Sequence, residues 1–358
     1  MPDDISVIIE WENVLLAEQD RCFRMLERLR KQALDSTRSI EVMVVFNPEQ
    51  VNRSIIEEAV GRYLTTPADD GRSLSCRIEA GPGMHYYQLK NHGSRLTQGA
   101  VIAFLDSDVI PEEGWLKALT EPFWSNPEIQ VLAGHTYLDP EDLMSRAFAL
   151  GWFFPLRSSE AALKAGSRYF FANNLAFRRS VLEAHPFPDM GEGMTRGACV
   201  MLKTDLSQHR IAIWGSSAAQ TCHPAPNGLA HFVARGLAQG RDWAMDCVAD
   251  GIPPWRTGLR ALRKFVSKPW RIFTRALRYG RGVGLPIWQV PLAVSIMVMF
   301  YLEGLLALAF LVLGMIYGAI AHHARAIGRD SHRRLVGLPG PPTLIRRAHA
   351  IASLGYSG

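Results

Sequence analysis

The sequence has few cysteines, and their spacing implies no function. It contains five, an odd number, and no two of them form a C-x-x-C pair; they are Cys22, Cys76, Cys199, Cys222 and Cys247. Such a set fits neither a disulfide framework nor a structural zinc site. We therefore expect a protein of a reducing compartment.

The chain also lacks the features of a secretory signal peptide. Its first four residues include two aspartates and lead directly into the apolar residues 5–9, without a basic segment or a small-residue cleavage site. We therefore expect residues 5–9 to be a strand of the fold. The sequence shows no internal repeat and no low-complexity segment.

Charge and apolar residues are unevenly distributed. The 358 residues carry a formal net charge of only +5, but Arg and Lys are concentrated in residues 256–281 and 325–347. A single long apolar stretch lies near residues 286–321. The length allows one large α/β domain with an appended region, or two domains. The basic segments predict an anionic surface as a partner.

The first hundred residues alternate between strand and helix patterns. Apolar runs at residues 5–9, 40–46 and 101–105 are typical of buried strands, and helical patterns precede the second and third of them. This βαβα order predicts an α/β fold built on a parallel sheet.

An acidic motif follows the third of these strands. Asp106-Ser107-Asp108 stands at the strand's carboxyl end, where open α/β sheets bind their ligands. Alternation along an extended segment would send both carboxylates to the same side, where they could share one hard cation and the phosphates it bridges. The alternative is a solvated acidic turn.

The residues around this motif resemble family 2 glycosyltransferases. Lys90-Asn91-His92-Gly93, Gly99-Ala100, the strand with its Asp-x-Asp, Pro111 and Trp115-Leu116 match that family in order and spacing. Asn13 and residues 173–179 also resemble family segments, so the resemblance covers about residues 5–240. It implies a GT-A fold, a Rossmann-like domain for nucleotide-diphospho-sugars with a mostly parallel mixed sheet, and transfer with inversion.

The resemblance implies roles for particular residues. Asp106 would contact the ribose or base of a nucleotide sugar, and Asp108 would hold Mg²⁺ or Mn²⁺ on its diphosphate. His223 would complete the metal shell, the alternative being a capping histidine in a proline-rich loop. The donor-binding residues so implied are Glu12, Asn47, Lys90, Asn91, Asp106, Ser107, Asp108 and Asn174.

Three segments depart from the family pattern. Residues 10–13 and Phe46-Asn47 replace segments that normally touch the nucleobase, so Trp11 or Phe46 either stacks on the base or packs in the sheet. The family's Glu-Asp, which supplies the general base, is replaced by Ala198-Cys199. Glu192, in a glycine-rich segment, is our alternative candidate for the base.

The C-terminal third carries a different pattern. Basic residues from 256 to 281 recur every three or four positions beside an apolar face, which predicts a helix interrupted at Pro269. Such a segment is typical of a membrane interface with anionic lipids, the alternative being a solvated face packed on the catalytic domain. Nothing indicates a nucleic-acid module.

The apolar residues 291–320 contain one charge, Glu303, which is costly at the centre of a bilayer. Both flanks are basic, so we expect both ends on the cytoplasmic side and a re-entrant or paired-helix insertion. The alternative is burial in a dimer or against the catalytic domain. The predicted division is residues 1–250, a catalytic domain; 251–325, a membrane-associated region; and 326–358, a flexible tail.

These features favour a glycosyltransferase at the cytoplasmic face of the cell membrane, with a lipid-linked or polysaccharide acceptor. A catalytically weakened relative that only binds a nucleotide sugar is the main alternative, because the usual base is missing. A nucleotidyltransferase would need a glycine-rich basic loop after the first strand. A phosphohydrolase of the haloacid-dehalogenase type would need Thr or Val where Ile110 stands, and a later acidic pair.

Overall fold

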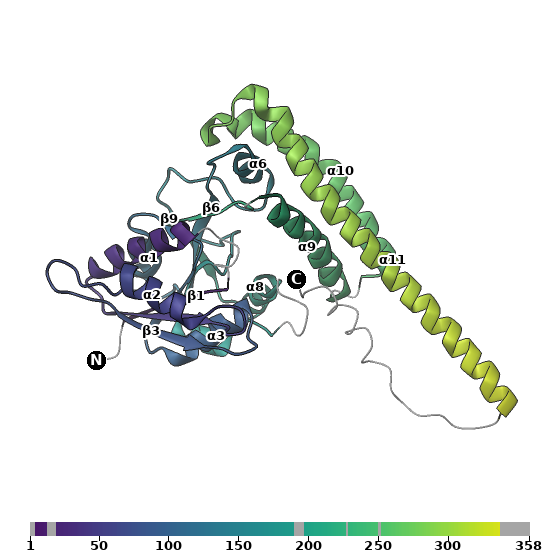
Figure 1. Ribbon diagram of the computed structural model, residues 1–358, viewed down its shortest axis with the longest axis horizontal. Coiled ribbons are helices and arrows are strands. Elements are labelled where there is room, and N and C mark those ends of the chain that lie inside the picture. The colour runs from purple at the N-terminus through teal and green to yellow at the C-terminus, as the bar shows by residue number, and fades with distance from the viewer. Residues whose placement is uncertain (1–3, 13–18, 190–196, 227, 250–251, 337–358) are drawn as a thin grey trace.

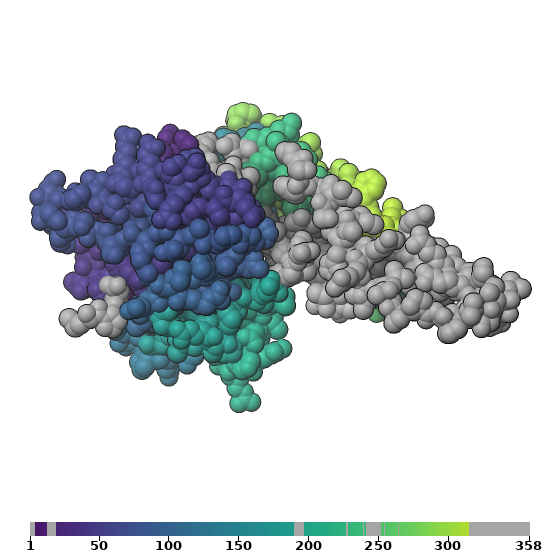
Figure 2. Space-filling model, turned by 60° about the horizontal axis from the view of Figure 1, so that its bottom comes forward, coloured from purple at the N-terminus to yellow at the C-terminus, as the bar shows by residue number. Residues whose placement is uncertain are grey.

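The computed structural model describes residues 4–12, 19–189, 197–226, 228–249 and 252–336. Asn13 and Glu192 lie outside these residues. The described chain forms a sheet domain covered by short helices, and three longer helices from the C-terminal third lie along one side of it (Figure 1). In the space-filling view the sheet domain is a single rounded body (Figure 2).

The described strands form one sheet in the order β3-β2-β1-β4-β8-β6-β9-β5, with β7 also paired to β9. They are β1 (Ile5–Glu10), β2 (Ile40–Phe46), β3 (Ser75–Ala80), β4 (Val101–Asp106), β5 (Ile110–Pro111), β6 (Val131–Leu138), β7 (Leu163–Ala165), β8 (Asn174–Arg178) and β9 (Ile213–His223). All pairings among β1 to β4 are parallel. β8 is antiparallel to both β4 and β6, so β6 runs in the same direction as β1 to β4. β9 shares this direction because it pairs with β6 in parallel. The predicted α/β fold with a mostly parallel mixed sheet is confirmed.

Helices cover both faces of this sheet. They are α1 (Gln19–Leu34), α2 (Arg53–Tyr63), α3 (Tyr86–Leu96), α4 (Trp115–Thr120), α5 (Pro122–Ser125), α6 (Leu143–Gly151), α7 (Arg179–Ala184) and α8 (Ala198–Gln208). Alternate residues of β1 point to opposite faces: Val7 and Ile9 pack with α1, α2 and α4, whereas Ile8 packs with α3 and α8. Both faces of the central strands are therefore buried, which explains their continuous apolar runs.

The three predicted strands are confirmed as β1, β2 and β4, but the sequence prediction missed β3. This strand pairs only with β2, at the edge of the sheet, and its side chains are partly exposed, so it carries no apolar run. β9 carries no continuous apolar run either, because partly exposed residues such as Ser217 and Gln220 lie among its buried ones.

The C-terminal third forms α9 (Gly228–Ala249), α10 (Pro254–Tyr279) and α11 (Val290–Val336), with two short 3₁₀ turns between α10 and α11. The predicted interruption at Pro269 is wrong, because α10 continues through it. An internal proline removes one helix hydrogen bond. The helix persists because Ala261, before the proline, and Ile272 and Ala276, after it, are all buried.

The apolar segment is one continuous helix within α11, without the turn that the expected re-entrant or paired-helix insertion would need. Its partners are α9 and α10, and the latter lies alongside it in Figure 1. Gly236 and Gly240 of α9 face Glu303 and Gly304, where any Cβ would overlap the Glu303 carboxylate or the Gly304 carbonyl. Glu303 therefore packs against another helix of the protein.

The described helices include one, Ile287–Gly314, that is long and apolar enough to cross a membrane, with 33% of it buried inside the protein. Because α9 packs on α11, the predicted domain boundary at residue 250 separates two helices that share one core. α11 also continues through residues 326–336, the first part of the predicted tail.

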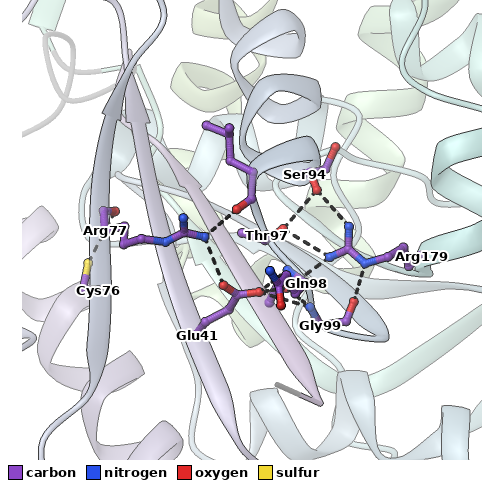
Figure 3. Close-up of polar contacts among 10 residues, drawn as sticks. Glu41, Cys76, Arg77, Ser94, Thr97, Gln98, Gly99 and Arg179 are labelled. Carbon is purple, nitrogen blue, oxygen red and sulfur yellow. Dashed lines mark hydrogen bonds and ion pairs between the residues drawn. The ribbon is translucent and has the colours of Figure 1, made fainter. Parts of the chain in front are cut away.

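A polar network holds the amino-terminal ends of the strands together (Figure 3). Glu41 on β2 accepts hydrogen bonds from Ser6 Oγ at 2.7 Å and from the Gly99 amide at 3.1 Å, and Arg77 lies 3.3 Å from it. Arg179 donates to the Gly99 and Ser94 carbonyls. The network ties β1, β2, β3 and β8 to the turn before β4, on the opposite edge from the acidic motif.

Glu41 gives this network a pH dependence. Burial alone would raise the pKa of Glu41, but the hydrogen bonds from Ser6, Gln98 and Gly99 and the charge of Arg77 outweigh it and lower that pKa. A lowered pKa means that the carboxylate stabilises the fold above its unfolded pKa of about 4.3, and that this contribution is lost as the pH falls through the folded value.

We therefore expect Glu41→Gln to lower the free energy of unfolding by about 2 kcal/mol near neutral pH, the range for hydrogen bonds to a charged group. The difference from the parent should shrink as the pH falls from neutral to well below the unfolded pKa of about 4.3. Urea unfolding of both proteins across this range measures it. A difference that stays constant with pH would contradict the assigned role.

Candidate active site

Several acidic side chains meet at the carboxyl edge of the parallel strands. Glu10 ends β1 and Asp106 ends β4, and the two residues are direct partners in the parallel register. Asn47 follows β2, and His223 ends β9. This edge is where α/β sheets bind ligands, so the topology brings together residues that lie more than two hundred positions apart.

The Asp106 carboxylate is held by helix α3. Lys90 Nζ lies 2.6 Å from its Oδ1, and the Tyr86 hydroxyl donates to its two oxygens at 2.8 and 2.9 Å. Lys90 is completely buried, which is rare for lysine unless it is paired. Tyr86 and Lys90 are four residues apart and so lie on one face of α3. Asp106 is therefore fixed in place, with one ammonium as its counter-charge.

Asp108 is placed by a turn rather than by strand alternation. β4 ends at Asp106, and the Val109 amide donates to the Asp106 carbonyl, so the extended segment assumed in the sequence prediction is not present. The carboxylate of Asp108 is buried, and its Oδ1 has no hydrogen-bond partner among the described residues; the same holds for Ser107 Oγ. Burial raises the pKa of Asp108 to about 6, with His223 opposing and Asp106 adding to this shift.

His223 and Asp108 are brought together by the pairing of β5 with β9. Ile110 pairs with Cys222 in antiparallel register, so Asp108 lies next to the residues that follow Cys222. Arg21 of α1 fixes both segments, because it donates to the Asp108 carbonyl at 2.8 Å and to the Cys222 carbonyl at 2.7 Å. Phe154 packs on the His223 ring, with centroids 4.9 Å apart.

This edge carries more negative than positive charge. Burial and the charge of Asp106 raise the pKa of Glu10, and burial raises that of Glu12 against the effect of His85. Glu12 Oε2, like Asp108 Oδ1, is buried without a hydrogen-bond partner in the described chain. Oxygen ligands from carboxylates are what Mg²⁺ and Mn²⁺ prefer. The residues present therefore fit a divalent cation at Asp108, with the imidazole of His223 beside it.

Three asparagines predicted to bind the donor have structural partners. Both Nδ2 hydrogens of Asn174 are used, towards the Ala219 carbonyl and Thr221 Oγ1, and its Oδ1 accepts from Trp115. Asn91 exchanges two hydrogen bonds with the Phe187 backbone, and Asn47 Oδ1 accepts from the Glu49 amide. Asn174 therefore joins β8 to β9 and α4, and Asn91 positions the segment at Phe187.

Two aromatic residues near the expected nucleobase position belong to the core. Trp11 and Phe46 are each 1% exposed and pack in the cluster on the α1 and α2 face. Of the two alternatives for these residues, stacking on a base or packing in the sheet, the structure shows packing.

The usual general base has no substitute at residues 198 and 199. Ala198 is completely buried at the start of α8, after Gly197 in the left-handed region, with φ of 95°. Burial raises the pKa of the Cys199 thiol to about 11, and the Tyr87 hydroxyl donates to its sulfur at 3.6 Å. Cys199 is therefore a neutral thiol near neutral pH. Glu192, the alternative base, lies outside the described residues.

The sequence prediction missed three residues of this site. The spacing of Tyr86 and Lys90 on one helix face, just before the acidic strand, could have revealed Tyr86. Glu10 could have been found from its position at the end of the first strand. Nothing local marks Arg21, because it reaches Asp108 and Cys222 through tertiary contacts alone.

The strand-end acidic cluster defines an α/β protein with a site suited to a cation and an anionic ligand. No protein-family model and no curated protein matches the sequence. The fold is similar to that of a mannosyltransferase from Pyrobaculum calidifontis solved with GDP-Man and Mn²⁺, at 16% identity and a TM-score of 0.49, over 87% of this chain and 88% of that one.

Two further solved structures are similar over part or most of this chain. S. aureus TarS 1-349, in complex with UDP-GlcNAc, shares 13% identity at a TM-score of 0.44, over 85% of this chain and 82% of that one. GalNAc-T7, with UDP, GalNAc and Mn²⁺, shares 12% identity at 0.43, over 63% and 44%. At these identities and TM-scores the likeness concerns the fold alone.

Proposed function

We propose that this protein transfers a glycosyl group from a nucleotide-diphosphate sugar to an acceptor hydroxyl, with a divalent cation bound at Asp108. The observation that carries the proposal is the buried Asp108 carboxylate, which has an oxygen without a hydrogen-bond partner at the carboxyl edge of the sheet. The resemblance of residues 5–240 to family 2 glycosyltransferases also supports glycosyl transfer.

In this proposal the cation, when bound, neutralises the charge that develops on the leaving diphosphate. The protein's own groups supply position. Lys90 and Tyr86 would hold Asp106 rigidly for a contact with the ribose or base. Arg21, which bonds the Asp108 and Cys222 carbonyls, would keep Asp108 and His223 close together. Such preorganised charge is usually the largest contribution to catalysis.

Inversion of the anomeric centre requires a general base near the acceptor oxygen. Glu192 remains our proposal for it. A second candidate function is nucleotide-sugar binding without transfer, and the specific observation in its favour is that the family's Glu-Asp is replaced by a buried alanine and a thiol whose pKa is raised to about 11.

The test is a screen of UDP-, GDP- and dTDP-sugars for stabilisation of the full chain, with Mn²⁺, with Mg²⁺ and with EDTA. We expect at least one donor to raise the melting temperature only when a cation is present, because a ligand that binds the folded state stabilises it by mass action. If a donor binds, loss of its sugar to an acceptor distinguishes transfer from binding alone. No stabilisation by any donor with either metal would overturn the proposal.

We also propose that the helical region rests on the cytoplasmic leaflet of a membrane. One side of α10 packs on the protein through Ala261, Ile272 and Ala276, yet a second apolar stripe on the same helix is exposed. Its members are Trp255, Leu259, Leu262, Val266, Trp270 and Leu277, each at least 48% exposed. An exposed apolar stripe flanked by arginines is the pattern of an interfacial helix, and a lipid-linked or polysaccharide acceptor would be reached there.

Replacing two stripe residues, as in Leu262→Glu/Trp270→Glu, should reduce binding to vesicles that contain anionic lipid at least tenfold. Each apolar side chain of this size contributes about 1.5–3 kcal/mol on leaving water. Vesicle flotation measures the loss. The control is Val200→Glu, at an equally exposed apolar position on α8 of the sheet domain, and an equal loss in that variant would argue against α10 as the contact.

A further inference from the structure

A cavity of about 720 Å³ lies where the sheet domain meets α10. Its walls come from the loop after α6, from Tyr169, and from the last turns of α10, including Thr274, Arg275 and Arg278. Neither Asp106 nor Asp108 lines it. The groups that line it carry mostly positive charge or hydroxyl donors.

The two arginines that α10 contributes have no carboxylate partner among the described residues. Arg275 is partly buried, and its Nε is fully covered without a hydrogen-bond acceptor. Burial and the neighbouring Arg271 lower the pKa of Arg275. The Arg278 guanidinium lies over the Tyr279 ring, 5.2 Å from its centroid. The covered Nε is out of reach of a molecule in the cavity, so an anion there would be bound by the terminal N–H groups of the two guanidiniums, which no carboxylate among the described residues occupies.

The other charged groups on the cavity wall do not cancel the positive charge of Arg275 and Arg278. Arg157 is paired with Glu112 at 2.9 Å, and Glu112 also accepts from the Tyr137 hydroxyl. Glu160 is the carboxylate that lines the cavity itself. Two unpaired guanidiniums therefore face one exposed carboxylate. The hydroxyls of Tyr169 and Tyr279 add donors, whereas those of Ser158 and Thr274 already donate to backbone carbonyls.

This set of donors suits a phosphate or diphosphate. Guanidinium groups bind such anions through paired N–H donors, and the two tyrosine hydroxyls can donate to further oxygen atoms of the anion. The volume of about 720 Å³ exceeds what a single phosphate needs and leaves room for the groups it carries.

The cavity adjoins the candidate active site through one segment of chain. Trp152 and Phe154 pack around His223, with ring centroids 6.5 and 4.9 Å away. The next residues, from Pro155 to Glu160, form the cavity wall. Arg157 further ties this wall to Glu112, which directly follows β5 and the acidic turn. A molecule held in the cavity would therefore have a short path to the metal side of the site.

The other side of the cavity adjoins the exposed apolar surface. Arg275 and Arg278 lie in the same turns of α10 as Leu277, which belongs to the exposed stripe. The turn that follows α10 exposes Ile287 and Trp288, at 71% and 69%. In Figure 1 this turn lies beside α6, at the end of the helix pair nearest the sheet domain. An apolar chain attached to the anion could lie on this surface.

We propose that the cavity binds the phosphate or diphosphate group of a membrane-anchored acceptor, through Arg275 and Arg278, and presents that acceptor to the donor site. The inference rests on the proposed glycosyl transfer and specifies the acceptor class as an amphipathic lipid phosphate. It predicts an anion site that works without a divalent cation and independently of the donor.

The experiment uses the full chain in detergent with EDTA, so that anions do not bind through a cation at Asp108. Inorganic pyrophosphate is titrated by calorimetry, and flotation compares vesicles of phosphatidylcholine that carry either a polyprenyl phosphate or phosphatidylserine. The variants are Arg278→Gln, an exposed position that cannot affect the core, and Arg275→Gln/Arg278→Gln. The matched control is Arg260→Gln/Arg263→Gln, which removes two exposed charges from the same helix away from the cavity.

We expect the parent to bind pyrophosphate and to prefer polyprenyl phosphate over phosphatidylserine, and the cavity variants to lose about tenfold in both, as expected for charge-assisted hydrogen bonds. The control should retain both.

Pyrophosphate binding without lipid preference would support the anion site but assign it to a free phosphate. Equal losses in cavity and control variants, or no pyrophosphate binding by the parent, would overturn the proposal. Donor binding with Mn²⁺, measured on the same variants, should be unchanged, which separates failure of this inference from failure of the proposed function.

Discussion

Asp108→Asn is expected to abolish cation-dependent binding of the nucleotide sugar and to lower turnover at least about a hundredfold. The asparagine keeps the size of the side chain but removes its charge, and loss of a direct ligand should exceed the 10–100-fold loss caused by removing an outer-shell partner. Binding of the donor identified in the screen, titrated with Mn²⁺ and with EDTA, measures the first effect, and sugar release measures the second.

The variant should fold as well as the parent. Burial raises the pKa of Asp108 and one of its oxygens has no hydrogen-bond partner, so the charged form is unfavourable without a cation. In EDTA we therefore expect an unchanged or slightly higher melting temperature. Asp70→Asn, at an exposed loop position, is the matched control and should behave as the parent. An Asp108→Asn protein that binds donor with the parent's affinity and responds equally to EDTA would remove the metal role.

Much of the sheet domain could be predicted from the sequence because burial on both faces produces continuous apolar strands. β1, β2 and β4 carry such runs, and the acidic motif is recognisable since it directly follows one of them. β3 could not be found this way, because an edge strand with partly exposed side chains carries a weak pattern. Pro269 misled the prediction, since tertiary packing on both sides of it preserves the helix.

The candidate site was predictable only where its residues are close in sequence. Lys90 and Asp106 are neighbours along the family-like segment, and the structure pairs them at 2.6 Å. The role of Arg21 depends on α1, the acidic turn and β9 meeting at one point, which is a property of the topology. The internal partners of Asn174 were likewise not predictable, because its amide joins β8 to β9 through tertiary contacts.

Lys90→Met is expected to destabilise the sheet domain by about 3–5 kcal/mol, the range for breaking a buried ion pair by removing one partner. Lys90 is completely buried and lies 2.6 Å from Asp106, so the substitution leaves a buried carboxylate without its counter-charge. Glu10, the register partner of Asp106, cannot compensate. Burial and the charge of Asp106 raise the pKa of Glu10, which favours its neutral form.

A double-mutant cycle separates this structural effect from function. Asp106→Asn added to Lys90→Met removes the uncompensated charge, so the double variant should regain most of the lost stability, since replacing both partners of a buried pair is often nearly neutral. Glu10→Gln should change stability less than Lys90→Met, because burial and the charge of Asp106 raise the pKa of Glu10 and so disfavour its charged form. Urea unfolding gives the four corners of the cycle. Donor binding should be lost in Lys90→Met and also in the double variant, because neither the ammonium nor the carboxylate remains at the site of the latter. Recovered stability together with recovered donor binding would show that the pair is structural only, whereas stability that stays low in the double variant would show that Lys90 acts through partners other than Asp106.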